Sequence, residues 1–234
     1  VDLVVDTDQE ALAAIRRFLS YLPDHNRLAA PRVPVPPGAD AAAARLPELV
    51  PQERRKTYDV HRAIEAIVDP GSFFGLKERF ARAAVTGLAR LDGRTVGIVA
   101  SNPRFKGGAL DADACSKITN FIVLCDSFNV PLVFMADTPG FLIGSDAEKR
   151  GMAGRIMNFL AAVEEATVPK LALVLRKSFG QAYINMAGGK GDETAAWVSS
   201  EISFMDPHVA VSVIFAGKQE ANGKSREEMM LEVA

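Results

Sequence analysis

The stretch VPKLALVLRKSFGQAYINMA, residues 168–187, decides the fold. Its near-continuous apolar run, 171–175, is typical of a parallel strand that is covered on both faces. This run leads into a glycine turn and then into what the pattern predicts to be a helix. The first N–H groups of that helix, on Gly180, Gln181 and Ala182, would be unpaired donors that can hold an oxyanion. The same Gly-x-Ala pattern also occurs in tight turns that serve only close packing.

Strand-and-helix units repeat through this part of the chain. Helical periodicity over 112–128 precedes the apolar strand 132–137, and periodicity over 146–166 precedes the strand 171–177. The segment ISFMDPHVAVSVIF, 202–215, is a shorter third unit. Such repeats predict an α/β fold that has a parallel sheet with right-handed crossovers.

Two loops follow these strands, Asp137-Thr138-Pro139-Gly140-Phe141 and the loop 179–183. Because ligands of parallel sheets bind at the carboxyl ends of the strands, we expect the two loops to converge on one pocket. The first loop also resembles the Asp-x-x-Gly element of GTP-binding switches, but the chain contains no Gly-x-x-x-x-Gly-Lys-[Ser/Thr] phosphate loop. Lys177, beside the glycine turn, could be catalytic, although a cation at a strand end is usually only solvated.

The first half of the chain divides by composition. Residues 7–22 predict an amphipathic helix that Thr7 or Asp8 caps. Residues 29–56 are rich in proline and alanine, which indicates a linker and a domain boundary. After a short predicted helix over 58–68, the segment 85–101 predicts a hairpin around Asp92-Gly93.

Composition excludes several classes of function. The 234 residues carry a net charge of −2 and no basic stripe, which argues against nucleic acid or an anionic membrane as partner. Apolar runs are too short for a membrane span, and the start lacks a signal-peptide pattern. The two cysteines, Cys115 and Cys125, form no Cys-x-x-Cys pair, so we expect no metal site and a reducing, cytoplasmic location.

Recognisable catalytic side chains are also missing. No serine lies in a Gly-x-Ser-x-Gly setting, and Gly188-Gly189-Lys190-Gly191 lacks the spacing of a phosphate loop or a dinucleotide fingerprint. The absence of a nucleophile, metal ligands and a cofactor fingerprint favours chemistry by backbone amides, which stabilise negative charge on oxygen.

Four blocks carry a family resemblance over nearly the whole chain. They are Tyr58-Asp59-Val60 with Phe73-Phe74, then VTGLARLDGRTVGIVASNP (85–103), CDSFNVPLVFMADTPGFLIGSD (125–146) and EEATVPKLALVLRKSFGQAY (164–183). These blocks resemble the carboxyltransferase (β-type) subunits of biotin-dependent acyl-CoA carboxylases, such as propionyl-CoA and acetyl-CoA carboxylase. The resemblance implies a crotonase-like (ClpP/crotonase) fold of repeated ββα units.

Proteins of this family contain two such domains in tandem, the first binding acyl-CoA and the second carboxybiotin. The present chain resembles the second. The resemblance therefore implies that residues 1–28 form the terminal helix of a preceding acyl-CoA-binding domain. Residues 29–56 would be the linker, and residues 57–234 a truncated carboxybiotin-binding domain.

The resemblance also implies a reaction, the transfer of a carboxyl group from carboxybiotin to the α carbon of an acyl-CoA. The backbone amides of Gly180, Gln181 and Ala182 would form the oxyanion hole that holds the biotin enolate. The family usually has Gly-Gly-Ala here, so the side chain of Gln181 is a departure that bears on how biotin fits.

Further residues and partners follow from the same resemblance. Gly140, Phe141 and Tyr183 would contact biotin, and Ile184 would bear on acyl-chain specificity. Biotin would arrive on a biotin carboxylase or biotin carboxyl carrier subunit, at an active site on a subunit interface of a homo-oligomer. We expect no metal, and a cytoplasmic location, or the mitochondrial matrix in a eukaryote. Two alternatives are a biotin-dependent acyl-CoA decarboxylase subunit and a catalytically degenerate crotonase-fold scaffold.

Overall fold

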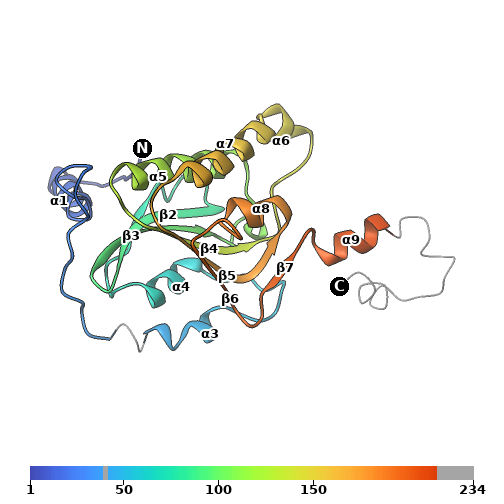
Figure 1. Cartoon of the computed structure of the whole chain (residues 1–234), viewed down its shortest axis with the longest axis horizontal. Coiled ribbons are helices and arrows are strands. Elements are labelled where there is room, and N and C mark those ends of the chain that lie inside the picture. The colour runs from blue at the N-terminus through green and yellow to red at the C-terminus, as the bar shows by residue number, and fades with distance from the viewer. Residues whose placement is uncertain (39–41, 215–234) are drawn as a thin grey trace.

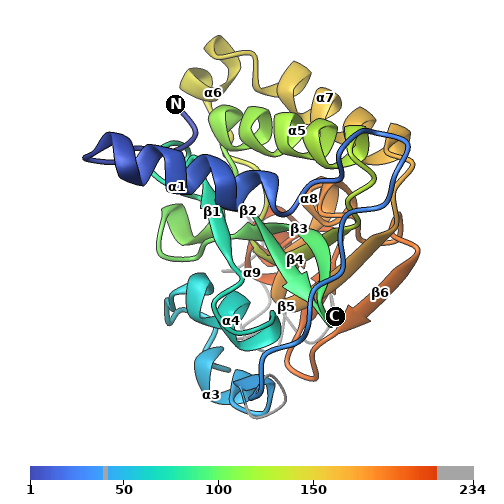
Figure 2. The same ribbon diagram turned by 90° about the vertical axis from the view of Figure 1, so that its left-hand side faces the viewer.

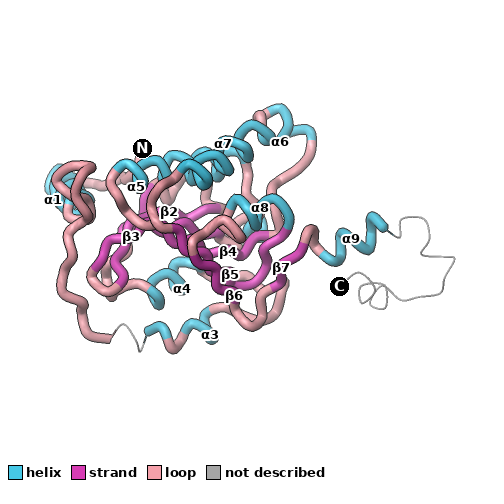
Figure 3. Tube along the Cα trace, viewed as in Figure 1, coloured by secondary structure: helices cyan, strands magenta, loops and turns pink. Residues whose placement is uncertain are grey.

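One twisted sheet with helices on both faces forms the body of the chain (Figure 1). The computed structural model describes residues 1–38 and 42–214. The last residue of the predicted 202–215 unit and the rest of the predicted domain up to residue 234 lie outside the described part. Figure 3 shows the strands as a single layer, with α5 and α7 on one side and α3 and α4 on the other.

The antiparallel part of the sheet is the hairpin that the sequence predicts. Strands β2 (Ala84–Leu91) and β3 (Arg94–Ser101) pair in register around Asp92 and Gly93. Both turn residues have positive φ, 50° and 71°, which a tight two-residue hairpin requires. The short strand β1 (Phe74–Leu76) pairs antiparallel with β2 and forms the edge of the sheet.

The other strands run parallel and confirm the repeated units. They are β4 (Leu132–Thr138), β5 (Lys170–Phe179), β6 (Glu193–Ala196) and β7 (Glu201–Ser203). Strand β4 pairs with β3 and β5, while β6 and β7 pair with the beginning and the end of β5. The helices α5 (Ala112–Ser127) and α7 (Met152–Glu165) connect successive parallel strands. Strand β6 was not expected from the sequence, because its four residues are all exposed and lack an apolar pattern.

One predicted helix is divided in two. The periodicity over 146–166 predicts a single helix, but the structure has α6 (Ser145–Lys149) and then α7. Gly151 lies between them in the left-handed conformation, with φ of 67°, which interrupts the helical path. The apolar face of α7 is buried as predicted, through Met152, Phe159 and Val163.

Each face of the sheet has its own apolar core. The larger core lies under α5 and α7, and includes the free thiols Cys115 and Cys125 as small core residues, as predicted. The second core lies under α4 (Val60–Ile67). The predicted linker contributes to this core through Leu46, in the short helix α3 (Leu46–Leu49), and Val50. Part of the segment 29–56 is therefore fixed to the domain body.

The first helix, α1 (Asp8–Leu19), is capped by Thr7 as the sequence predicts and lies beside β1 and α5 (Figure 2). It contacts the larger core through Ala14 and Phe18. Three further apolar residues of this helix remain more than half exposed: Leu12, Ile15 and Leu19. Among the described residues, no helix combines the length and the apolarity that crossing a membrane would need.

Candidate functional site

The carboxyl ends of β3, β4 and β5 lie at one edge of the sheet, where the sequence predicts a ligand. The edge is formed by the loop after β3, which contains the single 3₁₀ turn η1 (Lys106–Gly108), by the loop 139–144, and by α8 (Gly180–Asn185). A parallel bridge between Leu110 and Phe141 joins the first two loops. The two predicted loops therefore follow neighbouring strands, and their convergence on one pocket stays a prediction.

The turn from β5 into α8 requires a glycine. Gly180 has φ of 56°, and a Cβ there would lie 2.7 Å from the carbonyl oxygen of Phe204. Any side chain would therefore meet both backbone strain and a clash with the main chain after β7. Phe179 caps α8 without a side-chain hydrogen bond, and the N–H groups of a first helical turn have no partner within their own helix.

The two residues after Gly180 differ in exposure. Gln181 is exposed, and its side-chain Nε2 donates a hydrogen bond to Oδ1 of Asn185 at 2.9 Å. Asn185 in turn donates to the carbonyl of Ile156 on α7, also at 2.9 Å. The side chain of Gln181 thus lies along α8, held by its neighbour one turn later. Ala182, by contrast, is only 1% exposed.

The residues predicted to contact biotin are held by local interactions. The N–H of Gly140 donates to Oγ1 of Thr138 at 3.2 Å, and its carbonyl accepts from the N–H of Leu110 at 3.1 Å. Phe141 is partly buried against the larger core. The ring of Tyr183 lies directly against Gly188, where a Cβ would have no room.

A buried ion pair lies under this edge. Arg176, 3% exposed, contacts Oδ2 of the fully buried Asp137 through Nε and Nη2, each at 2.8 Å. Its Nη1 donates to the carbonyls of Glu53 and Lys56, each at 2.8 Å. A cation at a strand end is usually solvated, but Arg176 is buried because a carboxylate on the neighbouring strand pairs with it. Asp137 is likewise buried, and its carboxylate is occupied by the contacts with Arg176.

A cleft of about 340 Å³ opens above this ion pair, between residues 54–57, the loops after β3 and β4, and the end of β5. We call it the basic cleft, after the charged residues that line it: Arg54, Arg55, Lys56, Arg176, Lys177 and Asp206. Lys177 is partly buried, and desolvation lowers the pKa of its ammonium group. The guanidinium of Arg54 lies 5.4 Å from the ring centre of Phe179, so the cleft adjoins the start of α8.

A second cavity, of about 280 Å³, is also lined by residues of the loop after β3, among them Asn102, Arg104 and Phe105. Here Nδ1 of His61 is 2.9 Å from Oδ1 of Asp59, and its Nε2 is 3.9 Å from Oε1 of Glu78. Arg104 bonds the second carboxylate oxygen of Asp59 at 3.0 Å. Burial opposes the charge on Asp59, but hydrogen bonds from His61 and Arg104 outweigh it and lower the pKa of the carboxyl group.

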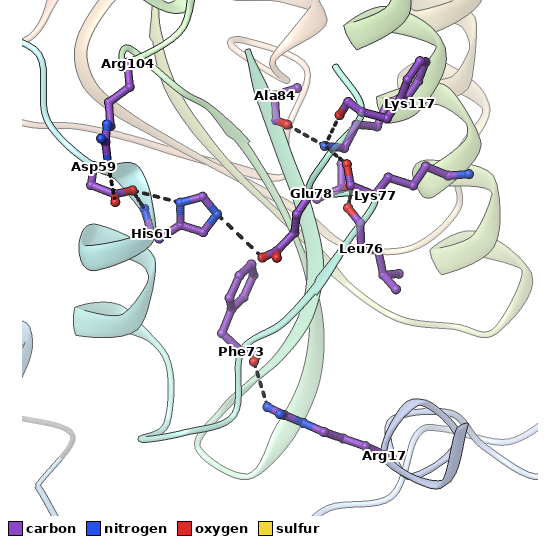
Figure 4. A network of polar contacts seen from close by, with 12 residues as sticks. Arg17, Asp59, His61, Phe73, Leu76, Lys77, Glu78, Ala84, Arg104 and Lys117 are labelled. Carbon is purple, nitrogen blue, oxygen red and sulfur yellow. Dashed lines mark hydrogen bonds and ion pairs between the residues drawn. The ribbon is translucent and has the colours of Figure 1, made fainter. Parts of the chain in front are cut away.

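Lys117 reaches the same cavity from α5 and is 2% exposed. Its Nζ donates to three backbone carbonyls, those of Lys77, Phe80 and Ala84, at 3.0, 3.0 and 2.7 Å (Figure 4). Desolvation lowers the pKa of Lys117 from 10.5 to about 8, although the charge of Glu78 opposes this change. The lysine thus fixes the loop between β1 and β2, and its hydrogen bonds to the described residues go to backbone carbonyls.

This depressed pKa predicts a pH dependence of stability. Between about pH 8 and 10.5 the unfolded chain keeps a proton on Lys117 that the folded chain releases, so the free energy of unfolding rises with pH. Lys117→Met removes this contribution. We expect the wild-type value minus the Lys117→Met value to grow by about 1–3 kcal/mol between about pH 7.5 and about pH 10, measured by urea unfolding. A constant difference would contradict the depressed pKa.

Sequence patterns did not predict the charged contacts around the second cavity. The contacts of His61 and Asp59 join the start of α4 to the loop after β1 and the loop after β3, and no motif links these residues in the chain. The one local signal was Asp59, which caps α4 two residues before His61. In residues 1–38 and 42–214, no group of three or more His, Cys, Asp or Glu side chains is arranged to hold a metal ion.

Comparison with known proteins agrees with this geometry. The family model described as "Carboxyl transferase domain" matches residues 1–233. The carboxyltransferase subunit of propionyl-CoA carboxylase from Haloferax mediterranei is 43% identical over 218 residues, which cover 92% of this chain and 42% of that protein. The mitochondrial propionyl-CoA carboxylase beta chain of Sus scrofa is 37% identical over 224 residues, covering 95% of this chain and 42% of that protein.

Solved structures extend the likeness to three dimensions. Transcarboxylase 12S, with methylmalonyl-coenzyme A and methylmalonic acid bound, superposes with a TM-score of 0.92 at 37% identity. The match covers 99% of this chain and 45% of that one. A single-chain, multi-domain long-chain acyl-CoA carboxylase superposes with a TM-score of 0.84 at 33% identity, covering 100% of this chain and 23% of that one. These matches confirm the crotonase-like fold.

The present chain spans about 42% of the length of these two propionyl-CoA carboxylase relatives. The match to the family model, in contrast, runs over nearly every residue. The parallel sheet, the glycine turn before α8 and the blocks quoted from the sequence all lie inside the matched region. The chain therefore belongs to the carboxyl transferase domain family.

Proposed function

We propose that this chain is the carboxybiotin-binding half of an acyl-CoA carboxyltransferase. The observation that carries the proposal is the turn between β5 and α8, where Gly180 is forced close to Phe204 and the first helical turn has no side-chain cap. Such a turn directs backbone N–H groups away from their own helix, and an oxyanion is the partner that they favour.

The donor set fits the ureido group of biotin, which has one carbonyl oxygen and no need of a metal. When bound, biotin supplies the carboxyl group that is transferred. The N–H groups of Gln181 and Ala182 would stabilise negative charge on an oxygen, with Gly180 setting their direction. The side chain of Gln181 is bonded to Asn185, so it lies along α8 rather than over the first N–H groups of the helix.

The rest of the pocket follows from the neighbouring loop. Gly140 and Phe141 would border the ring system from the carboxyl end of β4, and Tyr183 from α8. Ile184, which is partly buried on the same helix, would bear on the length of the acyl chain. These assignments rest on the position of the two loops after neighbouring strands.

The acyl-CoA-binding part of the active site and the carrier of biotin are proposed to come from other polypeptide segments. Residues 1–28 would end a preceding acyl-CoA-binding domain and residues 29–56 would connect it to the present domain, 57–234. This proposal agrees with the share of the relatives that the chain spans. Biotin would be presented by a biotin carboxyl carrier subunit, in a homo-oligomer whose active site lies between subunits. A related structure carries methylmalonyl-coenzyme A, so acyl-CoA is the proposed acceptor.

A transfer assay tests the proposal. The full-length protein, which includes the proposed acyl-CoA-binding domain, should in complex with its natural carrier move a carboxyl group from carboxybiotin to at least one of acetyl-, propionyl- and long-chain acyl-CoA, followed as labelled acid-stable product. The reverse reaction from the corresponding carboxyacyl-CoA separates a carboxylase from a decarboxylase by its preferred direction. Absence of exchange with every thioester would instead identify a scaffold.

A further inference from the structure

We propose that Arg54, in the basic cleft, is a positioning residue for the turn from β5 into α8. Its guanidinium joins three segments that meet at this turn, namely the segment 51–56, the end of β5 and the main chain 201–206. Arg54 is not one of the proposed oxyanion donors, so its effect on the reaction would be indirect. The inference rests on the proposed function for its effect on transfer, whereas its effect on the turn can be measured without any reaction.

The main chain around β7 forms one wall of the turn. Strand β7 pairs with the last three residues of β5, 177–179. One residue after β7, the carbonyl oxygen of Phe204 lies so close to Gly180 that a Cβ there would be 2.7 Å from it. A shift of the segment 201–206 would therefore change the space in which the first turn of α8 is held.

This wall has little apolar packing of its own. Within the described part of the chain, neither apolar core includes a residue of 201–206. Ile202 is 44% exposed and Phe204 is 84% exposed. Strand β7 is short and contributes only three residues to the sheet. Polar contacts therefore supply much of what keeps the segment against the turn.

Arg54 supplies such contacts at both ends of the segment. Its Nη1 is 3.2 Å from Oε2 of Glu201, the first residue of β7, and its Nη2 donates a hydrogen bond to Oδ2 of Asp206. Asp206 directly precedes α9 (Pro207–Ile214). The guanidinium presents several donors in a fixed plane and so can hold two carboxylates in a defined arrangement, whereas a lysine ammonium is a point charge on a flexible stem.

Further contacts connect Arg54 to the turn itself and to a fixed backbone. Its guanidinium lies 5.4 Å from the ring centre of Phe179, which is 2% exposed and caps α8. The backbone on either side of it is held by Arg176, which donates to the carbonyls of Glu53 and Lys56 at 2.8 Å each. Arg54 thus connects an anchored segment both to the wall and to the cap of α8.

The direction of the first N–H groups of α8 is expected to depend on this connection. Without the guanidinium, the segment 201–206 keeps its pairing with β5 but loses both ion pairs, so we expect the turn to become more mobile rather than to unfold. A misplacement of about 1 Å at a reacting group can lower a rate by about 10²-fold. The proposed oxyanion donors would therefore act less well, although each of them is still present.

Arg54→Met, which keeps an apolar stem and removes the guanidinium, tests the inference in the full-length protein in complex with its biotin carrier. We expect kcat for transfer to fall by about 10- to 100-fold. The KM for acyl-CoA should stay the same, because acyl-CoA is proposed to bind the preceding domain. Amide hydrogen exchange, followed by mass spectrometry, should be faster than in the wild type over 177–185 and 201–206.

Two further variants make the result specific. Arg54→Lys should retain part of kcat, since its ammonium group can still pair with one of the two carboxylates. Arg32→Met is the matched control, because Arg32 forms an exposed pair with Asp92 at the amino end of β3, the opposite edge of the sheet. We expect wild-type transfer and wild-type exchange over both segments in this control.

Both measurements are made well below the melting temperature of each variant, so that global unfolding contributes to neither. Faster exchange together with a lower kcat in Arg54→Met would support the inference. Wild-type exchange over the two segments, an unchanged kcat in an active protein, or an equal loss in Arg32→Met would each overturn it. If the wild type transferred no carboxyl group but Arg54→Met still exchanged faster, the positioning of the turn by Arg54 would stand and the proposed function would fail.

Discussion

Gln181→Pro is expected to lower the rate of carboxyl transfer by about 10²- to 10³-fold, the effect of losing one oxyanion donor. Proline has no backbone N–H, and its fixed φ suits the first turn of a helix. Gln181 is exposed, so the ring has room, and Gly180 before it has no Cβ that could clash. The rate should be measured with saturating acyl-CoA, together with the melting temperature of the variant.

Gln181→Ala is the matched control, because it removes the side-chain bond to Asn185 but keeps the N–H. We expect it to retain most of the wild-type rate. Ala182→Pro would also delete a donor, but Ala182 is 1% exposed, so its result would mix lost catalysis with disturbed packing. A wild-type rate in a folded Gln181→Pro protein would refute the role of this amide.

Breaking the buried ion pair is expected to give the largest loss of stability. Asp137→Ala leaves the guanidinium of Arg176 buried at 3% exposure without its carboxylate, and such a loss typically costs about 3–5 kcal/mol. We expect the free energy of unfolding, from urea titration, to fall by about that amount. Arg176→Met should be similarly destabilising, since it leaves the carboxylate of Asp137 alone and also frees the carbonyls of Glu53 and Lys56.

Two comparisons make this experiment specific. The double variant Asp137→Ala/Arg176→Met should recover part of the loss, because no unpaired charge remains. Asp113→Ala breaks an exposed pair with Arg150 and should leave the urea midpoint nearly unchanged. If Asp137→Ala lowered the free energy of unfolding as little as Asp113→Ala, the buried ion pair would not be a major contribution to stability.

The fold could be predicted because its signals are local. The apolar run 171–175 and the Asp92-Gly93 turn each specify a strand or a hairpin within a few residues, and the structure confirms both. The division between α6 and α7 was missed because the apolar periodicity continues across Gly151, whereas the helical backbone is interrupted there. Strand β6 was missed because its pairing with β5, rather than its own composition, defines it.

The charged contacts of the site could not be predicted, because they join distant residues. Arg176 meets the carbonyl of Lys56, 120 positions earlier in the chain, and it meets Asp137 only after β4 and β5 pair. Periodicity treats each charged residue as an exposed one, so a buried arginine at a strand end has no signature of its own. The roles of Gly180, Gln181 and Ala182 as donors, and of Gly140, Phe141, Tyr183 and Ile184 around them, remain predictions.

Because of the contact between Gly180 and Phe204, two adjacent positions differ in the side chains that they tolerate. A methyl group at position 180 would strike the main chain, whereas position 181 faces outward and already carries a long amide. Natural variation and laboratory selection can therefore change the side chain at position 181 without altering the architecture. Gly180, in contrast, cannot gain a side chain unless the main chain around it moves.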